Sequence, residues 1–395
     1  MASLLSTAGW ASAAERVLGR SWVVTPTDVL TPSTARQQGS DPSLRSRREA
    51  SVRRRLPTVP KTAIKDLLHW RLSRRFSIDP SGPWSGTRVT FVWQRHDLFA
   101  TAGLDLARRL GVPSVLFVPA AKVWEAEQWG TTRPGWGGLL EWRAERPSLL
   151  GADLVAAGSR QVVDQIVRMG VPEERVLLTP TGVDLDLFAE APDPTPLRRR
   201  LGLEDRFVVG WVGSFRRFHA LEQAVEAVST VPGTALLLVG DGPERSRIER
   251  LAHNLGAAAV FIGTVAHREL PAHLAAMDAA VVLAPVAQPF HYSPLKLAEY
   301  LAAGLPVVAP ASGQLAERLT DGVDAIVVPP HDVAALAAAL RRLRDDPEER
   351  ARLGKAARVA AEAEWSWEHQ VQRVIDALHR RHDGDSRHRA AALHT

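Results

Sequence analysis

Short apolar runs alternate with longer amphipathic stretches along most of the chain. In the second half, the apolar runs predict strands at Phe207–Val212, Ala235–Val239, Val260–Ile262, Ala280–Leu283, Pro306–Ala309 and Ala325–Val328. Stretches in which apolar residues recur with helical spacing lie between these runs. Because strands that alternate with helices usually pair in parallel, this pattern predicts an α/β fold with a parallel sheet.

The first half shows the same alternation, although less regularly. Its predicted strands are Ser3–Thr7, Ser21–Thr25, Val89–Trp93, Ser114–Val118, Leu154–Ala157 and Val176–Leu178. Its predicted helices are Ala11–Leu18, Phe99–Leu110, Gly137–Leu149 and Arg160–Met169. A second parallel sheet is therefore expected, with a turn at Ala8–Trp10 between the first strand and the first helix.

Proline and charge mark the boundaries between parts of the chain. Residues 189–200 hold Pro192, Pro194, Pro196 and three arginines, a composition typical of a linker. The expected divisions are an amino-terminal domain (1–188), a linker (189–200), a carboxyl-terminal domain (201–365), a helix that could cross back to the first domain (366–380) and a disordered polar tail (381–395).

The composition is that of a two-domain chain without membrane spans. At 395 residues, the chain is long enough for two domains that each have a core. No apolar run reaches the roughly 18 residues that a transmembrane helix needs, and the beginning of the chain lacks the features of a secretory signal. The absence of cysteine excludes disulfides, thiolate catalysis and Cys-ligated metal, and is compatible with the cytoplasm.

Positive charge is concentrated in one segment, residues 45–75. This segment has eleven lysines and arginines against two acids, Glu49 and Asp66, a local net charge of +9, whereas the whole chain has a formal net charge of +5. Apolar residues such as Trp70 are interleaved, and from Lys61 onward the pattern predicts a basic amphipathic helix. The interpretation favoured here is a solvated insertion whose apolar residues pack on the amino-terminal domain. Peripheral contact with an anionic membrane is the alternative, and no motif supports binding of nucleic acid.

The most informative part of the chain is a loop, a helix and a strand at residues 289–309. Its sequence is PFHYSPLKLAEYLAAGLPVVA. Free backbone amides and the positive end of the helix dipole at such a helix start favour phosphate. Lys296 adds a cation there, and Glu299, one turn further on, is an acceptor for two adjacent sugar hydroxyls. The pattern therefore predicts a nucleotide as ligand.

This segment resembles the nucleotide-binding signature of family-4 glycosyltransferases, which have the two-domain GT-B fold. Ser293–Ala309 follows a sub-pattern of that family, SPLKLxEYMAxGxPVVA. Family members usually carry glutamate at both of two positions, which here are His291 and Glu299. Further motifs that resemble the family follow in the right order at Pro180–Phe188, Val208–Val228, Leu236–Ala252 and Val260–Val282.

The resemblance implies an α/β fold of the GT-B class, in which two Rossmann-like domains with parallel sheets face a central cleft. It also implies a set of donor-binding residues in the carboxyl-terminal domain. These are Gly213, Ser214, Arg216, Gly263, Val265, His291, Ser293, Leu295, Lys296 and Glu299. Arg216 is the first choice for contact with a diphosphate, because an arginine next to a glycine turn can hold phosphate oxygens bidentately, and Lys296 is the second. Backbone atoms of Gly263 and Val265 are expected to recognise the base.

The amino-terminal domain is expected to hold the acceptor. Arg95 and His96 lie in a segment that resembles one at the end of a strand beside the cleft in some relatives, so they are candidates for contact with donor or acceptor. Glu125 and Glu127 follow the next predicted strand and are candidate acceptor-side groups. The predicted turn Ala8–Trp10 corresponds to a glycine-rich loop that touches the donor phosphates in the family.

The function that the resemblance implies is that of a retaining glycosyltransferase. The acceptor hydroxyl attacks the anomeric carbon of a nucleotide-diphosphate sugar on the face from which the leaving group departs, and a leaving phosphate oxygen takes the proton. Arg216, Lys296, Arg95 and His96 are the candidates for catalytic contacts. No cofactor is expected beyond the donor as co-substrate. Two alternatives stay open: a catalytically weak GT-B-like binding or partner subunit, suggested by His291, and a nucleotide-sugar epimerase.

Two Asp-x-Asp strings could be read as metal sites. Asp184–Asp186 lies in the segment between the domains, and Asp383–Asp385 lies in the polar tail. Neither follows an apolar strand that leads to a sugar-phosphate cleft. We therefore expect no metal, because cationic side chains and the helix dipole would supply the positive charge. The expected location is the cytoplasm, with peripheral contact at the inner membrane face if the basic segment meets lipid.

Overall fold

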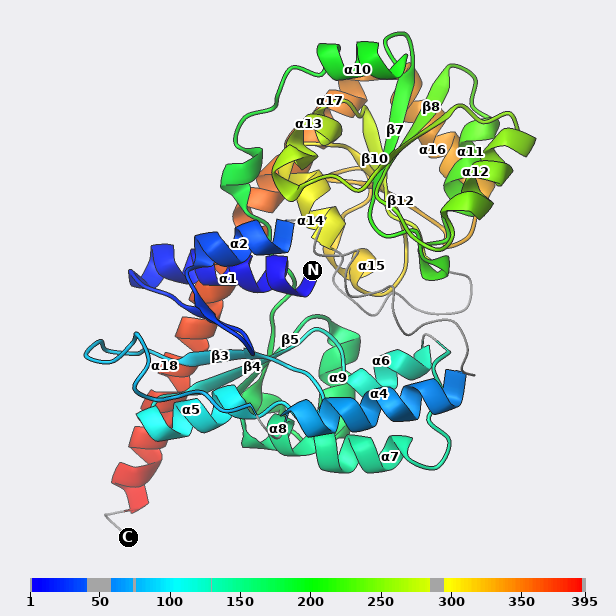
Figure 1. The fold of residues 1–395 in the computed structure, drawn as a ribbon. Helices are drawn as coiled ribbons and strands as arrows, with labels where there is room; N and C mark the ends of the chain where they lie inside the picture. The colour runs from blue at the N-terminus through cyan, green and yellow to red at the C-terminus, as the bar shows by residue number, and fades with distance from the viewer. Residues whose placement is uncertain (1, 41–57, 74–75, 129, 285–294, 393–395) are drawn as a thin grey trace.

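The chain folds into two α/β halves, one above the other in Figure 1, and each half is built on a parallel sheet. The computed structural model describes residues 2–40, 58–73, 76–128, 130–284 and 295–392. None of the helices in these residues has the length and apolarity that crossing a membrane requires.

The carboxyl-terminal half contains a six-stranded sheet in the order β12-β11-β10-β7-β8-β9. Its strands are β7 (Phe207–Val212), β8 (Thr234–Val239), β9 (Ala259–Gly263), β10 (Ala279–Val281), β11 (Val307–Pro310) and β12 (Ile326–Val328). All neighbouring strands are parallel. The chain order reverses between β7 and β10, and ligands of open α/β sheets bind at the carboxyl edge beside such a reversal.

Helices cover both faces of this sheet. They are α10 (Thr195–Leu201), η4 (Arg217–His219), α11 (Glu222–Ser229), α12 (Arg245–Asn254), η5 (His267–Glu269), α13 (Leu270–Ala275), α14 (Leu295–Ala302), α15 (Gln314–Arg318), α16 (Val333–Asp345), α17 (Pro347–Ala360) and η6 (Ala361–Trp365). One core cluster joins the sheet to α13, α14 and α17, and a second joins its other face to α11, α12 and α16. Burial on both faces explains why β7 and β8 are continuous apolar runs.

The amino-terminal half contains a four-stranded parallel sheet in the order β3-β4-β5-β6, with a separate two-stranded hairpin. The sheet strands are β3 (Val92–Arg95), β4 (Ser114–Val118), β5 (Leu154–Ala157) and β6 (Val176–Leu178), and the hairpin strands are β1 (Val23–Val24) and β2 (Val29–Leu30). The helices are α1 (Ala2–Leu18), α2 (Pro32–Ser40), α4 (Thr58–Ser73), α5 (Ala102–Leu110), α6 (Lys122–Gln128), α7 (Gly137–Leu140), η1 (Glu141–Glu145), α8 (Arg146–Gly151), α9 (Arg160–Arg168), η2 (Glu173–Arg175) and η3 (Leu185–Phe188).

The first residues of the chain differ from the prediction. Ser3–Thr7, predicted as a strand, and Ala8–Trp10, predicted as a turn, both lie within α1. Trp10 and the alanines one turn beyond it are buried together, which is the period of a helix and not of a strand. Gly9 serves packing here, because a Cβ at this position would lie 2.4 Å from Nε1 of Trp367.

Three other expectations also differ from the structure. The strand predicted at Ser21–Thr25 is reduced to β1, which pairs only with β2. The predicted linker 189–200 ends in α10, whose proline lies in the first turn, where its missing amide is tolerated, and whose Leu197 is buried. The tail predicted to be disordered from residue 381 continues as α18 (Trp367–Ala392).

The last helix, α18, packs on the amino-terminal half (Figure 1). Its residues Trp367, Val371, Val374 and Ile375 share a core with Phe117 and with α1. The backbone amide of Val183 donates to the carbonyl of Trp365 at 2.7 Å, and that of Trp367 donates to the carbonyl of Val183 at 3.2 Å. The two passages of the chain between the halves therefore lie side by side.

Candidate functional site

Three glycines form the floor of the site at the carboxyl edge of the larger sheet. Gly213, Gly240 and Gly263 follow or end β7, β8 and β9, with φ angles of 148°, 130° and 86°. The amide of Gly240 donates to the carbonyl of Gly263 at 2.7 Å, and a Cβ on Gly240 would lie 1.8 Å from the carbonyl oxygen of Gly213. Only glycine fits where backbones approach so closely. The three glycines therefore let the ends of these strands approach one another without side chains of their own.

Lys296 points at this floor from the first turn of α14. Its Nζ lies 4.0 Å from the centroid of the Trp211 ring and 3.0 Å from the position that a Cβ on Gly213 would take. Burial lowers the pKa of Lys296 to about 7, although the nearby Glu299 raises it. The hydroxyl of Tyr300, fully buried, accepts a hydrogen bond of 2.7 Å from the amide of Val212 and so fixes α14 to the end of β7. An anion at Gly213 would restore the full charge of Lys296.

The turn after β7 presents a second cation. Phe215 is fully buried against the edge of the Trp211 ring, at 5.4 Å between centroids, and this anchors the turn while Ser214 and Arg216 stay exposed. Among the residues that the structure describes, Arg216 has no ion-pair partner. His219 is buried behind the turn, and burial, together with the charges of Lys296 and Arg216, lowers its pKa to about 2. This histidine therefore stays neutral, and the two cations lie on the same side of the sheet edge.

Glu299 is held in place by a histidine that the sequence did not indicate. Its side chain is buried, and its Oε1 lies 2.8 Å from Nε2 of His267 on η5. Burial lowers the pKa of His267, but the hydrogen bond and charge of Glu299 outweigh this effect, so the pKa of His267 is raised overall. His267 follows Gly263 at the same edge, which is the only signal in the sequence that could have pointed to it.

The remaining predicted donor residues fall into three groups. Gly263 belongs to the glycine floor, and Val265 is half-buried against the core of this half. Leu295 lines a small cavity between the halves, together with Glu299 and His267 from one half and residues of α1 and α2 from the other. The predicted residues His291 and Ser293 lie outside the described residues.

Arginines from the amino-terminal half reach Asp184 at the rim of this cavity. Arg36 of α2 forms an ion pair and a hydrogen bond with Asp184, and Arg16 of α1 lies 3.7 Å from the same carboxylate. Asp186 is exposed and 3.9 Å from Arg16. Both acids of this Asp-x-Asp string thus face arginines. Within the described parts of the chain, no cluster of three or more His, Asp or Glu side chains is arranged to hold a metal ion.

His96, a predicted contact for donor or acceptor, lies in a closed network. Its Nε2 is 2.9 Å from Oε1 of Glu145, and both side chains have no exposed surface. The same carboxylate accepts the amides of Lys122 and Val123 at the start of α6, the latter at 3.0 Å. Burial raises the pKa of Glu145, but the bonds from His96 and the two amides lower it further, so the carboxylate stays charged. No local pattern in the sequence pointed to Glu145, which lies on η1, 49 residues beyond His96.

Arg95 and Glu125 come together at the edge of the smaller sheet, whereas Glu127 does not join them. Arg95 ends β3, lies 5.7 Å from the Phe117 ring centroid, and has a pKa lowered by burial and raised in part by Glu125 and Asp97. Glu125 forms an ion pair of 2.9 Å with Lys122. Glu127 is exposed and lies on the side of α6 that faces the start of α7.

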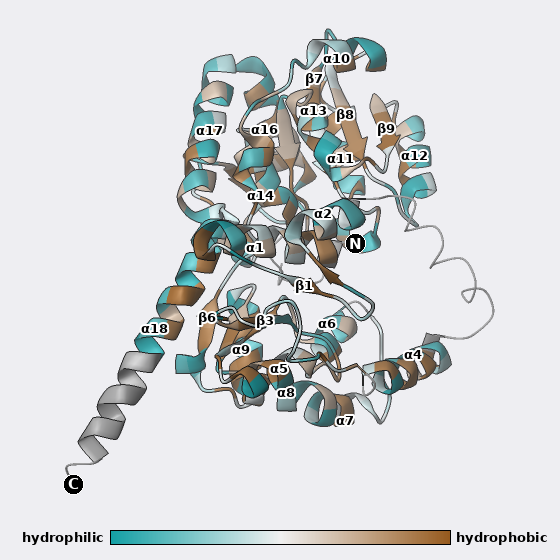
Figure 2. Cartoon of the chain, turned by 60° about the vertical axis from the view of Figure 1, so that its left-hand side comes forward, coloured by the Kyte–Doolittle hydropathy of each residue, from teal (hydrophilic) through white to brown (hydrophobic). Residues whose placement is uncertain are grey.

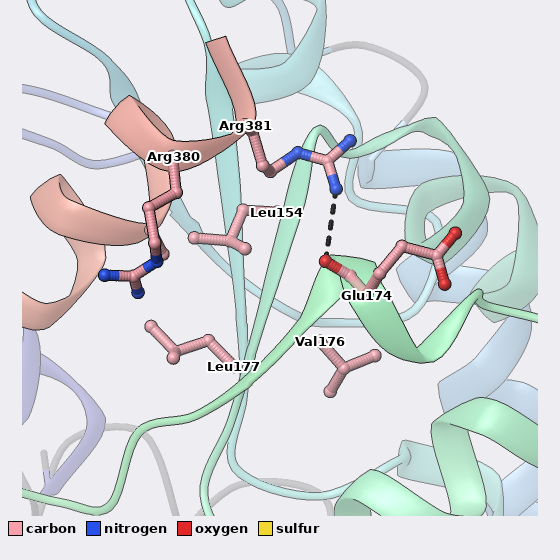
Figure 3. A pocket seen from close by; sticks show the side chains of 7 residues that line it. Leu154, Glu174, Val176, Leu177, Arg380 and Arg381 are labelled. Carbon is pink, nitrogen blue, oxygen red and sulfur yellow. Dashed lines mark hydrogen bonds between the residues drawn. The ribbon is translucent and has the colours of Figure 1, made fainter. Parts of the chain in front are cut away.

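A larger cavity, of about 250 Å³, lies away from these residues (Figure 3). It is formed by α18, β5, β6 and η2, and in Figure 3 Arg381 reaches across it to donate to the carbonyl of Glu174 at 3.2 Å. None of the predicted site residues lines it.

Comparison with known proteins places both halves in one group of enzymes. Residues 27–187 match the family model described as Glycosyltransferase Family 4, and residues 206–346 match the model described as Glycosyl transferases group 1. Among solved structures, Anabaena HepE in complex with UDP is similar with a TM-score of 0.59 and 20% identity over 82% of this chain and 84% of that one. Sucrose-phosphate synthase from Thermosynechococcus elongatus is similar with a TM-score of 0.61 and 25% identity over 80% and 79%.

The chain has the GT-B fold and is built of two glycosyltransferase domains. The predicted fold class is therefore confirmed. A GDP-mannose-dependent alpha-(1-6)-phosphatidylinositol monomannoside mannosyltransferase from Mycolicibacterium smegmatis is 33% identical over 58% of this chain and 62% of its own length. A D-inositol 3-phosphate glycosyltransferase from Geodermatophilus obscurus is 36% identical over 55% and 50%. The match thus spans less than two thirds of these curated relatives.

Proposed function

We propose that the protein is a retaining glycosyltransferase that moves a sugar from a nucleotide-diphosphate sugar to an acceptor hydroxyl. The observation that carries this proposal is the meeting of the glycine floor, the half-buried Lys296 and the fixed carboxylate of Glu299 at the switch point of the larger sheet. The glycine floor and Lys296 suit a diphosphate, and the carboxylate of Glu299 suits the hydroxyls of a ribose. The names of the relatives agree, since they include a GDP-mannose-dependent enzyme and a complex with UDP.

The diphosphate would lie over Gly213, between Arg216 and Lys296. Both cations would then face the charge that grows on the phosphates as the bond to the sugar breaks, which is the place where fixed charge lowers a barrier most. Glu299 would accept hydrogen bonds from the two ribose hydroxyls, with His267 holding its carboxylate in place. The backbone at Gly263 and Val265 would contact the base.

The acceptor would approach from the amino-terminal half. Arg95, Lys122 and Glu125 gather at the edge of that half and are its best candidates for contact with hydroxyl groups. Relatives named for phosphatidylinositol mannoside and inositol phosphate acceptors point to a polyol, either small or carried on a lipid. His96 would act through the position of α6 rather than by touching substrate, because its side chain is fully buried.

In this retaining reaction, the acceptor hydroxyl oxygen forms the new bond to the anomeric carbon as the bond to the diphosphate oxygen breaks. The proton of the hydroxyl passes to the leaving phosphate oxygen, so no protein base is required. The side chains of this chain position the two substrates and stabilise the leaving group. We place this reaction in the cytoplasm, with peripheral contact at the inner face of a membrane.

Donor binding and turnover test this proposal separately. Calorimetric titration with GDP, UDP and their mannose and glucose derivatives should find at least one nucleotide that binds wild type and Lys355→Ala alike but binds Lys296→Ala more weakly. Lys355 is a matched control because it is an exposed lysine on α17. Release of the nucleoside diphosphate in the presence of inositol or its phosphate then reports transfer.

Three results would contradict the proposal. Binding without any turnover, across a panel of acceptors, would indicate a partner subunit. Interconversion of the free nucleotide sugar without an acceptor would indicate an epimerase. If no nucleotide binds, the donor site itself is misassigned.

A further inference from the structure

Helix α4 turns its polar side toward the protein and its apolar side away from it. Thr62 and Asp66 are 7% and 6% exposed, whereas Ile64, Leu67 and Leu68 are 48%, 61% and 54% exposed. At 100° per residue, these two sets lie on opposite faces of the helix. A helix on the surface of a globular protein normally buries its apolar stripe. The expectation that the apolar residues of the basic segment pack on the amino-terminal domain is therefore wrong.

This orientation is fixed by specific bonds. Asp66 accepts from Nε and Nη2 of Arg133 at 2.8 and 3.1 Å, and from Nε1 of Trp136 at 3.1 Å. Burial raises the pKa of Asp66, but the bonds from Arg133 and Trp136 lower it further, so the carboxylate is charged. Rotating α4 to bury its leucines would leave the buried guanidinium of Arg133 unpaired, which is strongly unfavourable.

The exposed face of α4 also carries its cations. Lys61, Lys65 and Arg71 are exposed and stand around the leucines, and the only acid of the helix, Asp66, points inward. Figure 2 shows the hydrophobic residues of α4 at the outer edge of the amino-terminal half, next to α7. On α7 and the adjoining η1, Leu139 and Trp142 are also exposed. The result is an apolar surface ringed by positive charge.

We propose that the outward face of α4, formed by Lys61, Ile64, Lys65, Leu67, Leu68 and Arg71, docks the protein on an anionic lipid bilayer. Apolar side chains beside lysines suit the boundary between acyl chains and phosphate headgroups. A second copy of this chain is the poorer occupant, because face-to-face packing would bring the basic residues of α4 against one another. Docking would put the amino-terminal half next to the membrane.

Vesicle co-sedimentation of the full chain without nucleotide tests this proposal. Wild type should pellet with vesicles of equal parts phosphatidylcholine and phosphatidylglycerol, and not with phosphatidylcholine alone. Binding should weaken between about 0.1 M and about 1 M salt, as the Debye length falls from about 10 Å to about 3 Å. The measurement does not depend on the proposed transfer reaction, so either can fail without the other.

Two double variants separate the apolar and the charged contributions. Leu67→Gln with Leu68→Gln should weaken binding more than about tenfold at both salt concentrations. Lys61→Gln with Lys65→Gln should weaken it about fivefold per lysine at low salt and little at high salt. The matched controls, Val359→Gln and Lys355→Gln on α17, remove an exposed apolar and an exposed basic side chain from the other half and should bind as wild type does.

Several outcomes would overturn the proposal. These are equal binding to both lipids, no binding to either, or wild-type binding by both double variants. Analytical ultracentrifugation supplies a further one. If wild type forms a dimer that Leu67→Gln with Leu68→Gln abolishes, the face is an interface between two copies of the chain and not a lipid contact.

Discussion

The carboxyl edges of the two sheets, where most of the candidate site residues lie, differ in how their charged side chains are paired. At the carboxyl-terminal edge, neither Lys296 nor Arg216 forms an ion pair with a carboxylate in the described part of the chain, and Lys296 is buried enough for its pKa to fall to about 7. At the amino-terminal edge, His96 is paired with Glu145, and Lys122 with Glu125. An edge that keeps its cations unpaired is suited to an anion from outside. At the amino-terminal edge, Arg95 also has Glu125 and Asp97 nearby, and side chains of both signs are suited to contact with the hydroxyl groups of a polyol.

Removal of Lys296 or Arg216 from the carboxyl-terminal edge should have the largest effect on turnover. Lys296→Ala and Arg216→Ala should each lower kcat by about 100-fold or more, in the range found when one group that stabilises developing charge is removed. Thermal unfolding and turnover, measured on the same samples, check this effect. Unchanged turnover in both variants would mean that the phosphate site lies elsewhere.

The charged side chain of Lys296, which the proposed diphosphate site requires, should also lower the stability of the folded protein. The pKa of Lys296 falls from its usual value of 10.5 to about 7 on folding, so the folded state binds this proton less tightly than the unfolded state does. The resulting penalty is fully present below about pH 7 and disappears as the pH rises toward 10.5. Lys296→Met should therefore raise the free energy of unfolding at pH 6 by at least about 1.4 kcal/mol, the value of one pKa unit. Denaturant titration of wild type and variant at pH 6 measures this difference. An equal or lower free energy of unfolding in Lys296→Met would contradict the expectation.

At the other edge, the paired residues should matter for stability more than for donor binding. Glu145→Ala would leave His96 and two helix amides without their acceptor, and loss of a buried partner of this kind costs about 3–5 kcal/mol. His96→Ala should act in the same direction. Nucleotide affinity of the folded fraction should stay near wild type. A large loss of nucleotide affinity with full stability would instead place His96 and Glu145 in direct contact with the donor.

Substitution of Glu299 should have a smaller effect, on donor affinity, and tests where the ribose binds. Glu299→Ala should weaken nucleotide-sugar binding by about 1.5–3 kcal/mol, because hydrogen bonds to a charged acceptor are lost. A donor with 2′,3′-dideoxyribose should bind wild type and variant alike. If the variant binds the normal donor as tightly as wild type does, the ribose assignment is wrong.

Chelation is expected to have the smallest effect. Arg36 and Arg16 face Asp184, so this string is engaged with arginines. Activity should therefore survive EDTA. Complete loss that magnesium or manganese restores would contradict the assignment of the positive charge to Arg216 and Lys296.

Elements of the fold that depend on neighbouring residues in the chain could be predicted from the sequence, whereas those that depend on contacts between distant residues could not. The strands Ser114–Val118, Leu154–Ala157, Val176–Leu178 and Phe207–Val212 were predicted to the residue, because each is a short run of mainly apolar residues. All of them except Val176–Leu178, which is partly buried, are buried along nearly their whole length. The strand predicted at Ser3–Thr7 was wrong, because a short run of Ser, Leu and Thr fits either period. These residues belong to α1, which packs against Trp367 at Gly9.

The candidate site residues also divide into those that a local pattern predicts and those that a distant partner determines. Lys296 and Glu299 could be predicted, because they lie three residues apart in one predicted helix. His267 and Glu145 were missed, because each pairs with a residue 32 or 49 positions away and no local pattern records such a pair. The outward face of α4 could not be predicted either. An amphipathic helix can turn either side inward, and the choice is made by Arg133, 67 positions from Asp66.

The pH dependence of nucleotide binding tests the central claim most directly. Lys296 must carry its proton when the diphosphate binds, so the affinity of wild type for the nucleoside diphosphate should fall by up to about tenfold per pH unit above pH 7. Lys296→Met corrects for titration of the nucleotide itself, and calorimetry should show that it binds weakly and without this fall. Equal affinity and the same pH profile in wild type and Lys296→Met would contradict a donor diphosphate seated at Gly213 and Lys296.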